Sequence, residues 1–210
     1  MIPKCSWSWA LSLGKSVDIA ACVSAVSEIT NEQAIARVRA WIERFVVDLN
    51  LCPFAGPIVS SDALRIVACE SASPKVIATL LIRELDLLSQ SEESDIATSV
   101  LVFPEGLEDF DGYLRLLDDA QMLLGEMGSG GEFQLASFHP DYRFEGEPID
   151  AVSHFTNRAP YPLIHLLRES MVTTALETYP NAERIPERNI RTLERLGLVG
   201  IERLLHSLAS

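Results

Sequence analysis

The sequence predicts an α/β fold with a small, mainly parallel sheet of about three strands, flanked by helices and followed by a C-terminal helical segment. Three short apolar runs bounded by polar residues are typical of buried strands. Two amphipathic segments of about 16 to 19 residues separate these runs, which indicates consecutive βαβ units with right-handed crossovers. A polar stretch beyond the third run concentrates histidine, arginine and proline, and we expect the functional site there.

The first helix is predicted to start after Thr30. The Thr30 hydroxyl and the Gln33 side chain are spaced as a capping box, in which each satisfies a free backbone N–H of the other residue. Apolar residues then recur at three- and four-residue steps from Ile35 to Leu49, which predicts one buried helix face. Pro53 ends this helix, so residues 51–54 are expected to form a turn.

The remaining elements follow from the same patterns. A helix opens at Ser73-Pro74, because the N–H that proline lacks would be unpaired in the first turn anyway. Another begins at about Asp109 and ends at the glycine-rich breaker after Gly128. Strands are predicted at residues 64–69, 98–103 and 133–138, and later helices at residues 161–177, 186–196 and 199–208.

Length and composition are those of one soluble globular domain. The chain has 210 residues, of which 48% are hydrophobic and 22% charged, far from the composition of a disordered chain. We expect a single α/β domain over residues 30–210 and a poorly ordered N-terminal extension over residues 1–29. Lys15 and Asp18 interrupt the apolar part of this extension too early for a signal peptide, and no run approaches the roughly 20 apolar residues of a membrane span.

Charge and cysteine usage restrict the partners and the compartment. A formal net charge of −13 repels a phosphate backbone, so we expect no nucleic acid partner, and any anionic ligand needs a local basic pocket. The four cysteines are widely spaced and form no CxxC pair, which favours reduced thiols in a cytoplasmic protein. The chain has no GxGxxG or Walker-type loop, so no cofactor is predicted.

Residues 137–168 hold three of the four histidines. His139 directly follows the third predicted strand, at the edge of a parallel sheet where ligands usually bind. We interpret His139 as a catalytic acid or base and Asp141 as the residue that orients it.

An anion is the expected ligand of this segment. Asn157 and Arg158 precede the expected helix at 161–177, and the first turn of a helix offers free N–H groups and a partial positive charge. Guanidinium groups grip a carboxylate or phosphate through paired N–H donors. The predicted ligand-binding residues are Arg143, Asn157, Arg158, Tyr161, His165 and Arg168.

Structural roles for these residues remain open alternatives. A buried His139 can bond to a carbonyl, His165 can pair with Glu169, and the arginines can form surface ion pairs. His139, Asp141 and His165 are possible zinc ligands, but their spacing fits no known motif, so no metal is predicted. A nucleophilic Cys52 is disfavoured, because the carboxyl end of the preceding helix carries a partial negative charge.

Several motifs in one order resemble the bacterial domain-of-unknown-function family 1415. The resemblance runs from about Thr30 to Gly197 and implies an uncharacterised cytoplasmic protein. The motifs that carry it are Asn50-Leu-Cys-Pro-Phe-Ala55, Ala136-Ser-Phe-His-Pro-Asp-Tyr-Arg-Phe144, Thr156-Asn-Arg-Ala-Pro-Tyr-Pro162, His165-Leu-Leu-Arg-Glu169 and Glu187-Arg-Asn189.

The sequence therefore predicts a small cytoplasmic enzyme that acts on an anionic metabolite, bearing phosphate or carboxylate, through a pocket of His, Asp and Arg side chains. Two alternatives stay open. One is a non-catalytic module that binds a ligand or a protein through the same arginines and Tyr161. The other is a metal-assisted hydrolase.

Overall fold

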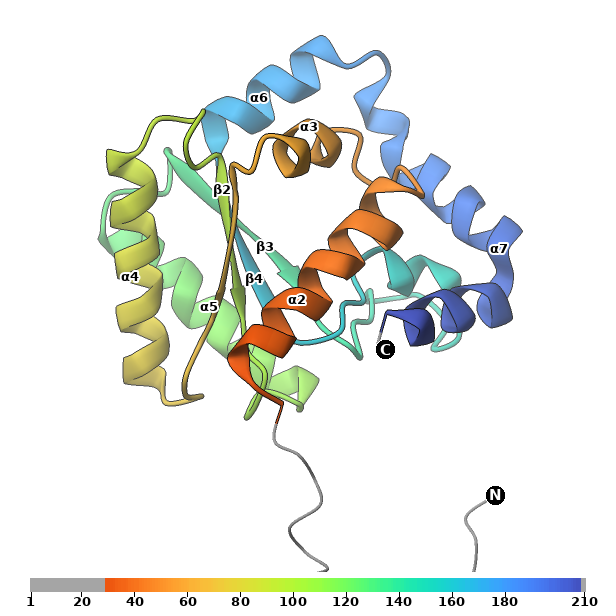
Figure 1. Ribbon diagram of the computed structural model, residues 1–210, viewed down its shortest axis with the longest axis horizontal. Helices are drawn as coiled ribbons and strands as arrows, with labels where there is room; N and C mark the ends of the chain where they lie inside the picture. The colour runs from red at the N-terminus through yellow and green to blue at the C-terminus, as the bar shows by residue number, and fades with distance from the viewer. Residues whose placement is uncertain (1–28, 209–210) are drawn as a thin grey trace, which may run out of the picture.

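Four strands form one sheet in the order β1-β2-β4-β3 (Figure 1). In this computed structural model, which describes residues 29–208, β1 (Leu64–Ala68) pairs in parallel with β2 (Thr98–Val102). β4 (Leu163–Arg168) lies between β2 and β3 (Phe133–Phe138) and runs antiparallel to both. The α/β class is confirmed, but the sheet is mixed and has four strands, not a mainly parallel sheet of three.

The prediction of a helix at residues 161–177 is wrong. Residues 163–168 form β4, and only the part from Glu169 onward is helical, as α6 (Glu169–Thr178). Leucine and arginine have high helix propensity, which made a helix the expected outcome. In the fold this segment pairs with a strand on each side, and that pairing outweighs the propensity of six residues.

The first helix has the predicted cap. α2 (Asn31–Trp41) continues into a wider π-helical turn, η1 (Ile42–Val47). The Gln33 N–H donates to Thr30 Oγ1 at 3.2 Å, and the Thr30 N–H donates to Gln33 Oε1 at 2.9 Å. The capping box is therefore confirmed.

The middle of the chain also follows the prediction. α4 (Pro74–Gln90) begins with its proline, and α5 (Phe110–Glu126) is capped by the Asp109 carboxylate. A short helix, α3 (Ala55–Ser60), was not predicted. It lies between the residue 51–54 turn and β1.

The C-terminal helices form one bent element. α7 (Ile185–Ser207) contains Gly197 with a φ of 67°, a left-handed conformation that interrupts the helix. The two halves of α7 correspond to the predicted helices at 186–196 and 199–208. Two 3-10 turns, η2 (Val152–Thr156) and η3 (Ala182–Arg184), complete the described elements.

Each face of the sheet carries its own hydrophobic core. Val100, Val102 and Leu163 face α2 and α7, whereas Leu101, Ile164 and Leu166 face α4 and α5. Figure 1 shows these helices on opposite sides of the strands, with α3 and α6 beyond one end of α2. The alternation along β2 and β4 explains why both strands are almost wholly buried.

The predicted N-terminal extension, residues 1–29, lies outside the described residues apart from Ile29. Within residues 29–208 the longest helices are too polar or too short to cross a membrane.

Candidate functional site

The carboxyl ends of β1, β2 and β3 lie at one edge of the sheet. β3 and β2 are both antiparallel to β4, so they run in the same direction, and β1 runs parallel to β2. This edge, which we call the carboxyl edge, also holds the start of β4, because Leu163 pairs with Phe138 and Val102. His139 follows β3 there, as expected.

His139 is fully buried and has a partner at each ring nitrogen. Its Nε2 lies 2.9 Å from the carbonyl oxygen of Leu107, and its Nδ1 accepts from the Asp141 N–H at 3.0 Å. A carbonyl only accepts, so Nε2 carries the proton and the ring is neutral. Here His139 joins the loops after β2 and β3, and a proton transfer through it would require one of these bonds to open.

The backbone of Asp141, not its carboxylate, contacts His139. The carboxylate instead lies close enough to Arg158 to act on its charge. Desolvation is the main cause that lowers the pKa of Arg158, Asp141 opposes this shift, and the neighbouring Arg143 adds to it. The structure thus brings Asp141, Arg143 and Arg158 together at the carboxyl edge.

Arg158 is held in a fixed orientation. Its Nε donates to the Tyr142 carbonyl at 3.2 Å, and its guanidinium lies over the Phe155 ring, 4.5 Å from the centroid. Such stacking restricts the side chain but leaves the terminal Nη groups available for an anion.

Asn157 and Tyr161 hold the same region together. The Asn157 side chain donates to the Ser137 carbonyl at 3.0 Å, and the backbone carbonyl of Asn157 accepts from the His139 N–H at 3.1 Å. The Tyr161 hydroxyl accepts from Arg37 at 3.2 Å. Asn157 therefore has a structural partner, and the expected helix N-terminus after it does not exist.

His165 and Arg168 lie away from this cluster. His165 is in the middle of β4, where its Nε2 contacts Thr98 Oγ1 at 2.7 Å. Arg168 pairs with Phe133 at the opposite edge, and its Nη2 contacts three backbone carbonyls near the end of α4. The eight predicted site residues thus do not line one cavity.

A small cavity of about 200 Å³ does open at the carboxyl edge. Asp141 and Tyr161 line it, together with Glu108 and apolar residues of the same loops. A bond from the Gly106 N–H is the main cause that lowers the pKa of Glu108, so its carboxylate stays ionised. The lining among the described residues has two carboxylates and no arginine, which does not favour an anion inside the cavity.

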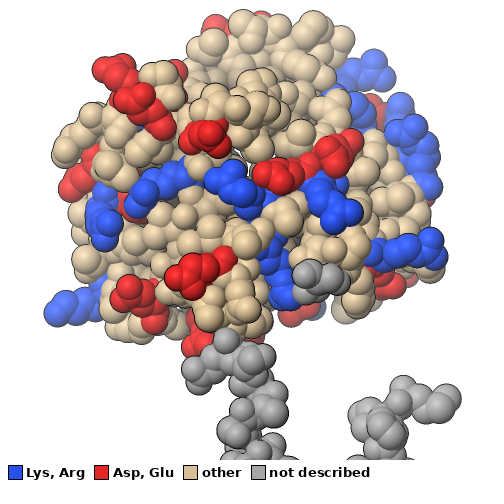
Figure 2. Space-filling view, in the orientation of Figure 1, with Lys and Arg blue, Asp and Glu red and all other residues tan. Residues whose placement is uncertain are grey.

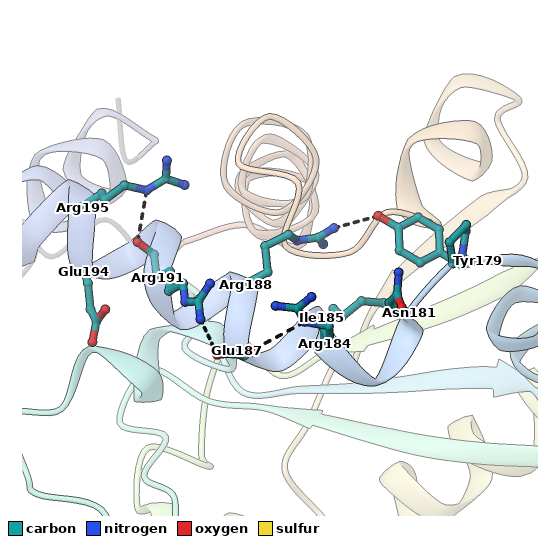
Figure 3. Close-up of a pocket in the computed structure, with 10 residues that line it drawn as sticks. Tyr179, Asn181, Arg184, Ile185, Glu187, Arg188, Arg191, Glu194 and Arg195 are labelled. Atoms are coloured by element: carbon teal, nitrogen blue, oxygen red, sulfur yellow. Dashed lines mark hydrogen bonds and ion pairs between the residues drawn. The ribbon is translucent and has the colours of Figure 1, made fainter.

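A larger cavity of about 660 Å³ lies along the first half of α7. We call it the α7 groove. Figure 3 shows Arg195 at one end and Tyr179 at the other, with Arg188 reaching toward Tyr179 between them. Residues that line the groove include Tyr179, Arg184, Glu187, Arg188, Arg191 and Arg195.

The arginine spacing places these side chains on one helix face. Positions 184, 188, 191 and 195 differ by four, three and four residues, and residues so spaced are neighbours on a helix surface. That spacing was visible in the sequence, and the Glu187-Arg-Asn189 motif marks the same place. The predicted site centred on histidines instead, and no histidine lies among the residues that line this groove.

Two glutamates also line the α7 groove, so its arginines are only partly neutralised. Glu187 pairs with Arg191 one turn away and with Arg184 at 3.8 Å. With four arginines and two glutamates, the lining keeps an excess of two positive charges in a chain of net charge −13.

Arg188 connects the groove to the turn that follows α2. Its Nη1 donates to the Tyr179 hydroxyl at 2.7 Å and its Nη2 to the Asn50 carbonyl at 2.8 Å. The next residue, Asn189, donates to the Leu51 carbonyl at 2.7 Å. These bonds fix the wall of the groove without using its exposed arginines.

Cys52 lies in this turn. Burial raises the pKa of its thiol, while N–H groups of Phe54 and Ala55 and the charge of Arg188 oppose the shift. The net direction favours a neutral thiol. Within residues 29–208, no group of three or more His, Cys, Asp or Glu side chains is arranged to hold a metal ion.

Fold and cavities together define a mixed α/β protein with an arginine-lined groove along its C-terminal helix. The chain belongs to the family described as "Protein of unknown function (DUF1415)", whose model matches residues 33–203. The resemblance found in the sequence is therefore confirmed. A search of curated proteins and a search of solved structures each found no match.

Proposed function

We propose that this protein binds a small anionic molecule, bearing phosphate or carboxylate, in the α7 groove. The observation that carries the proposal is the row of four arginines along the larger of the two cavities described above. Figure 2 shows Lys and Arg side chains gathered at the edge of the molecule where α7 lies. In a chain of net charge −13, a local positive potential attracts anions that the remaining surface repels.

The geometry of the arginines supports anion binding with a small loss of conformational entropy. Arg191 and Arg195 are exposed and lie one turn apart, so both guanidinium groups can reach one phosphate or carboxylate. Glu187 already holds Arg191 by an ion pair, which reduces the conformational entropy that binding would remove.

The test is a thermal-shift and calorimetric titration of the full chain with inorganic phosphate, pyrophosphate and citrate at low salt. We expect R191Q and R195Q each to weaken binding about threefold to tenfold, as loss of one solvent-exposed hydrogen bond of about 0.7–1.4 kcal/mol predicts. Arg203 is an exposed arginine of the same helix outside the groove, so R203Q is the matched control and should bind like the wild type.

Two results would contradict the proposal. One is the absence of binding of all three anions at millimolar concentration. The other is an equal loss of affinity in R203Q, because general charge attraction and not the groove would then explain binding.

A catalytic role for the protein is a second candidate, at the carboxyl edge. The supporting observation is that the Asp141 carboxylate lines a cavity beside Arg143 and Arg158, whose stacked guanidinium keeps terminal donors available. In this candidate the anion binds on Arg143 and Arg158 beside the cavity and not inside it, so R143Q and R158Q remove the stabilisation by anions, whereas R191Q leaves it unchanged. Arg168 is unsuitable for this test, because it contacts backbone carbonyls at the end of α4 and its replacement would lower the stability of the fold.

We place the protein in the bacterial cytoplasm as part of this proposal. The two cysteines within the described residues, Cys52 and Cys69, are free, which is typical of a reducing compartment.

A further inference from the structure

The α7 groove has two chemically different ends. At one end Tyr179 lies with Pro180 and Ile185, an aromatic ring and two apolar side chains. Arg191 and Arg195 lie toward the other end, and Figure 3 shows Arg195 well separated from Tyr179. A ligand that is charged at every position would use only part of this surface.

The Tyr179 ring is held in a fixed orientation by two contacts. Its hydroxyl accepts from Arg188 at 2.7 Å, and its ring packs edge-on against Phe54, with centroids 5.4 Å apart and planes at 80°. The side chain is only half-buried, so part of the ring remains open to a ligand. A ring whose rotation is already restricted loses little entropy when another ring stacks on it.

The length of the groove supports a ligand larger than one phosphate. Residues 184 and 195 are eleven positions apart on nearly continuous helix, a span of about 16 Å at 1.5 Å per residue. The cavity volume of about 660 Å³ lies within the range of sites for cofactor-sized molecules.

The two carboxylates limit where negative charge can sit. Glu187 occupies the middle of the arginine row, where it pairs with Arg184 and Arg191, and Glu194 also lines the groove. A polyanion stretched along the row would meet Glu187, whereas Figure 3 shows the Glu194 side chain pointing away from Arg195. A ligand with its charge at one end, and with uncharged hydroxyl or amino donors in the middle, would instead find acceptors there.

We infer that the α7 groove takes a phosphate joined through a polar linker to a planar ring, the chemistry of a mononucleotide, with its ring on Tyr179 and its phosphate on Arg191 and Arg195. This inference rests on the proposed anion binding and adds the class of ligand. Arg188 does not bind the phosphate in this arrangement and instead positions the Tyr179 ring.

The test compares four probes on the full chain by isothermal titration calorimetry: adenosine 5′-monophosphate, ribose 5-phosphate, inorganic phosphate and adenosine. We expect adenosine 5′-monophosphate to bind about tenfold more tightly than ribose 5-phosphate, the gain that one base-on-aromatic stack gives. Ribose 5-phosphate should in turn bind more tightly than inorganic phosphate, because its hydroxyl groups can donate to Glu187.

Variants assign the two ends separately. Y179L removes the ring and should reduce the preference for adenosine 5′-monophosphate to less than about twofold, whereas Y179F keeps the ring and most of the preference. R191Q combined with R195Q should weaken the binding of adenosine 5′-monophosphate and of ribose 5-phosphate about tenfold or more, and should leave the binding of adenosine unchanged. Far-ultraviolet circular dichroism of each variant checks that it is folded.

Equal affinities of the wild-type chain for adenosine 5′-monophosphate and ribose 5-phosphate would contradict the binding of a planar ring at Tyr179. Such a result would not contradict anion binding in the α7 groove. That comparison needs no variant, so a misfolded Y179L cannot obscure it. Loss of the preference in Y179F as well as Y179L would also contradict ring binding at Tyr179, since the hydroxyl and not the ring would then be responsible.

Discussion

Arg168 stabilises the end of a helix from 80 residues away in the sequence. Its Nη2 donates to the carbonyls of Leu88, Ser91 and Ile96 at 2.6, 2.8 and 3.1 Å, and Leu88 belongs to the last turn of α4. Carbonyls in the last turn of a helix have no partner within the helix. The Leu88 carbonyl also accepts from the Ser91 N–H at 3.2 Å, so the positively charged group adds a second donor there and also binds the carbonyls of Ser91 and Ile96.

Because one nitrogen makes all three contacts, lysine should replace Arg168 better than alanine does. We expect R168A to lower the free energy of unfolding by about 3 kcal/mol, from the loss of its charge-assisted bonds to three carbonyls. R168K keeps an ammonium with three donors and should cost about 1 kcal/mol. Urea denaturation monitored by circular dichroism measures both, and equal losses would show that the guanidinium packing matters more than the carbonyl contacts.

In contrast to the positively charged Arg168, His165 is a neutral side chain within the sheet. Thr98 Oγ1 donates to the Leu166 carbonyl at 2.5 Å, so it accepts from His165 Nε2, which must carry the proton. Desolvation lowers the pKa of His165 to about 4. Protonation in the folded state is therefore unfavourable throughout the mildly acidic range.

This shift predicts how stability changes with pH. The unfolded chain binds a proton at His165 below its ordinary pKa of about 6.5, whereas the folded chain does so only near pH 4. Stability is then greatest above pH 6.5 and falls between pH 6.5 and 4, by up to about 3 kcal/mol at this site. H165Q retains a donor toward Thr98 and cannot titrate, so its unfolding curves should lose less stability over this range. Parallel curves for the two proteins would refute the assignment.

Among the elements, the loops after β1 and β2 pack closely against each other at a position that only a glycine fits. Gly106 has a φ of 83°, and a Cβ on it would lie 2.3 Å from the Cβ of Ala72. Both residues belong to loops at the carboxyl edge, so a side chain at 106 would push the two loops apart. The left-handed backbone adds a second cost for any residue other than glycine.

We predict that G106A destabilises the fold more than an otherwise similar substitution. Gly146 has a φ of 80°, and a Cβ added there would meet no neighbouring atom of the described residues within 4 Å, so G146A carries only the backbone cost of about 1 kcal/mol. G106A adds the clash with Ala72 and should lose at least about 2 kcal/mol more. Thermal unfolding of the two variants separates these contributions. A G106A protein as stable as G146A would mean that the loops move apart freely.

Local sequence patterns explain why some elements were predictable from the sequence and β4 was not. β1, α4, β2, α5 and β3 each have an apolar pattern that matches their own period, and their bounds follow the prediction closely. β4 has six residues whose pattern suits a helix or a buried strand equally well. Its identity depends on pairing with β2 and β3, which no local pattern records.

For the whole molecule, the candidate site also depends on contacts between distant parts of the chain, which the sequence alone does not reveal. The place of His139 after β3 followed from strand order, but its partner Leu107 comes from a loop 32 residues earlier, and only the fold reveals that both ring nitrogens are engaged. The α7 groove needs α7 and Tyr179 to meet the turn at Asn50, a contact across 138 residues. Arginine spacing alone predicts a charged helix face and cannot predict a cavity beside it.

The central, reversed position of β4 also matters while the protein is being made. On the ribosome, β3 emerges about 30 residues before β4, which is its hydrogen-bonding neighbour, and at 5–20 residues per second that interval lasts on the order of seconds. Until then the nascent chain carries two apolar strands, β2 and β3, each with an edge that still lacks its partner. We therefore expect chaperone capture and misassembly between neighbouring nascent chains to be concentrated in this interval, which closes when residue 168 clears the exit tunnel.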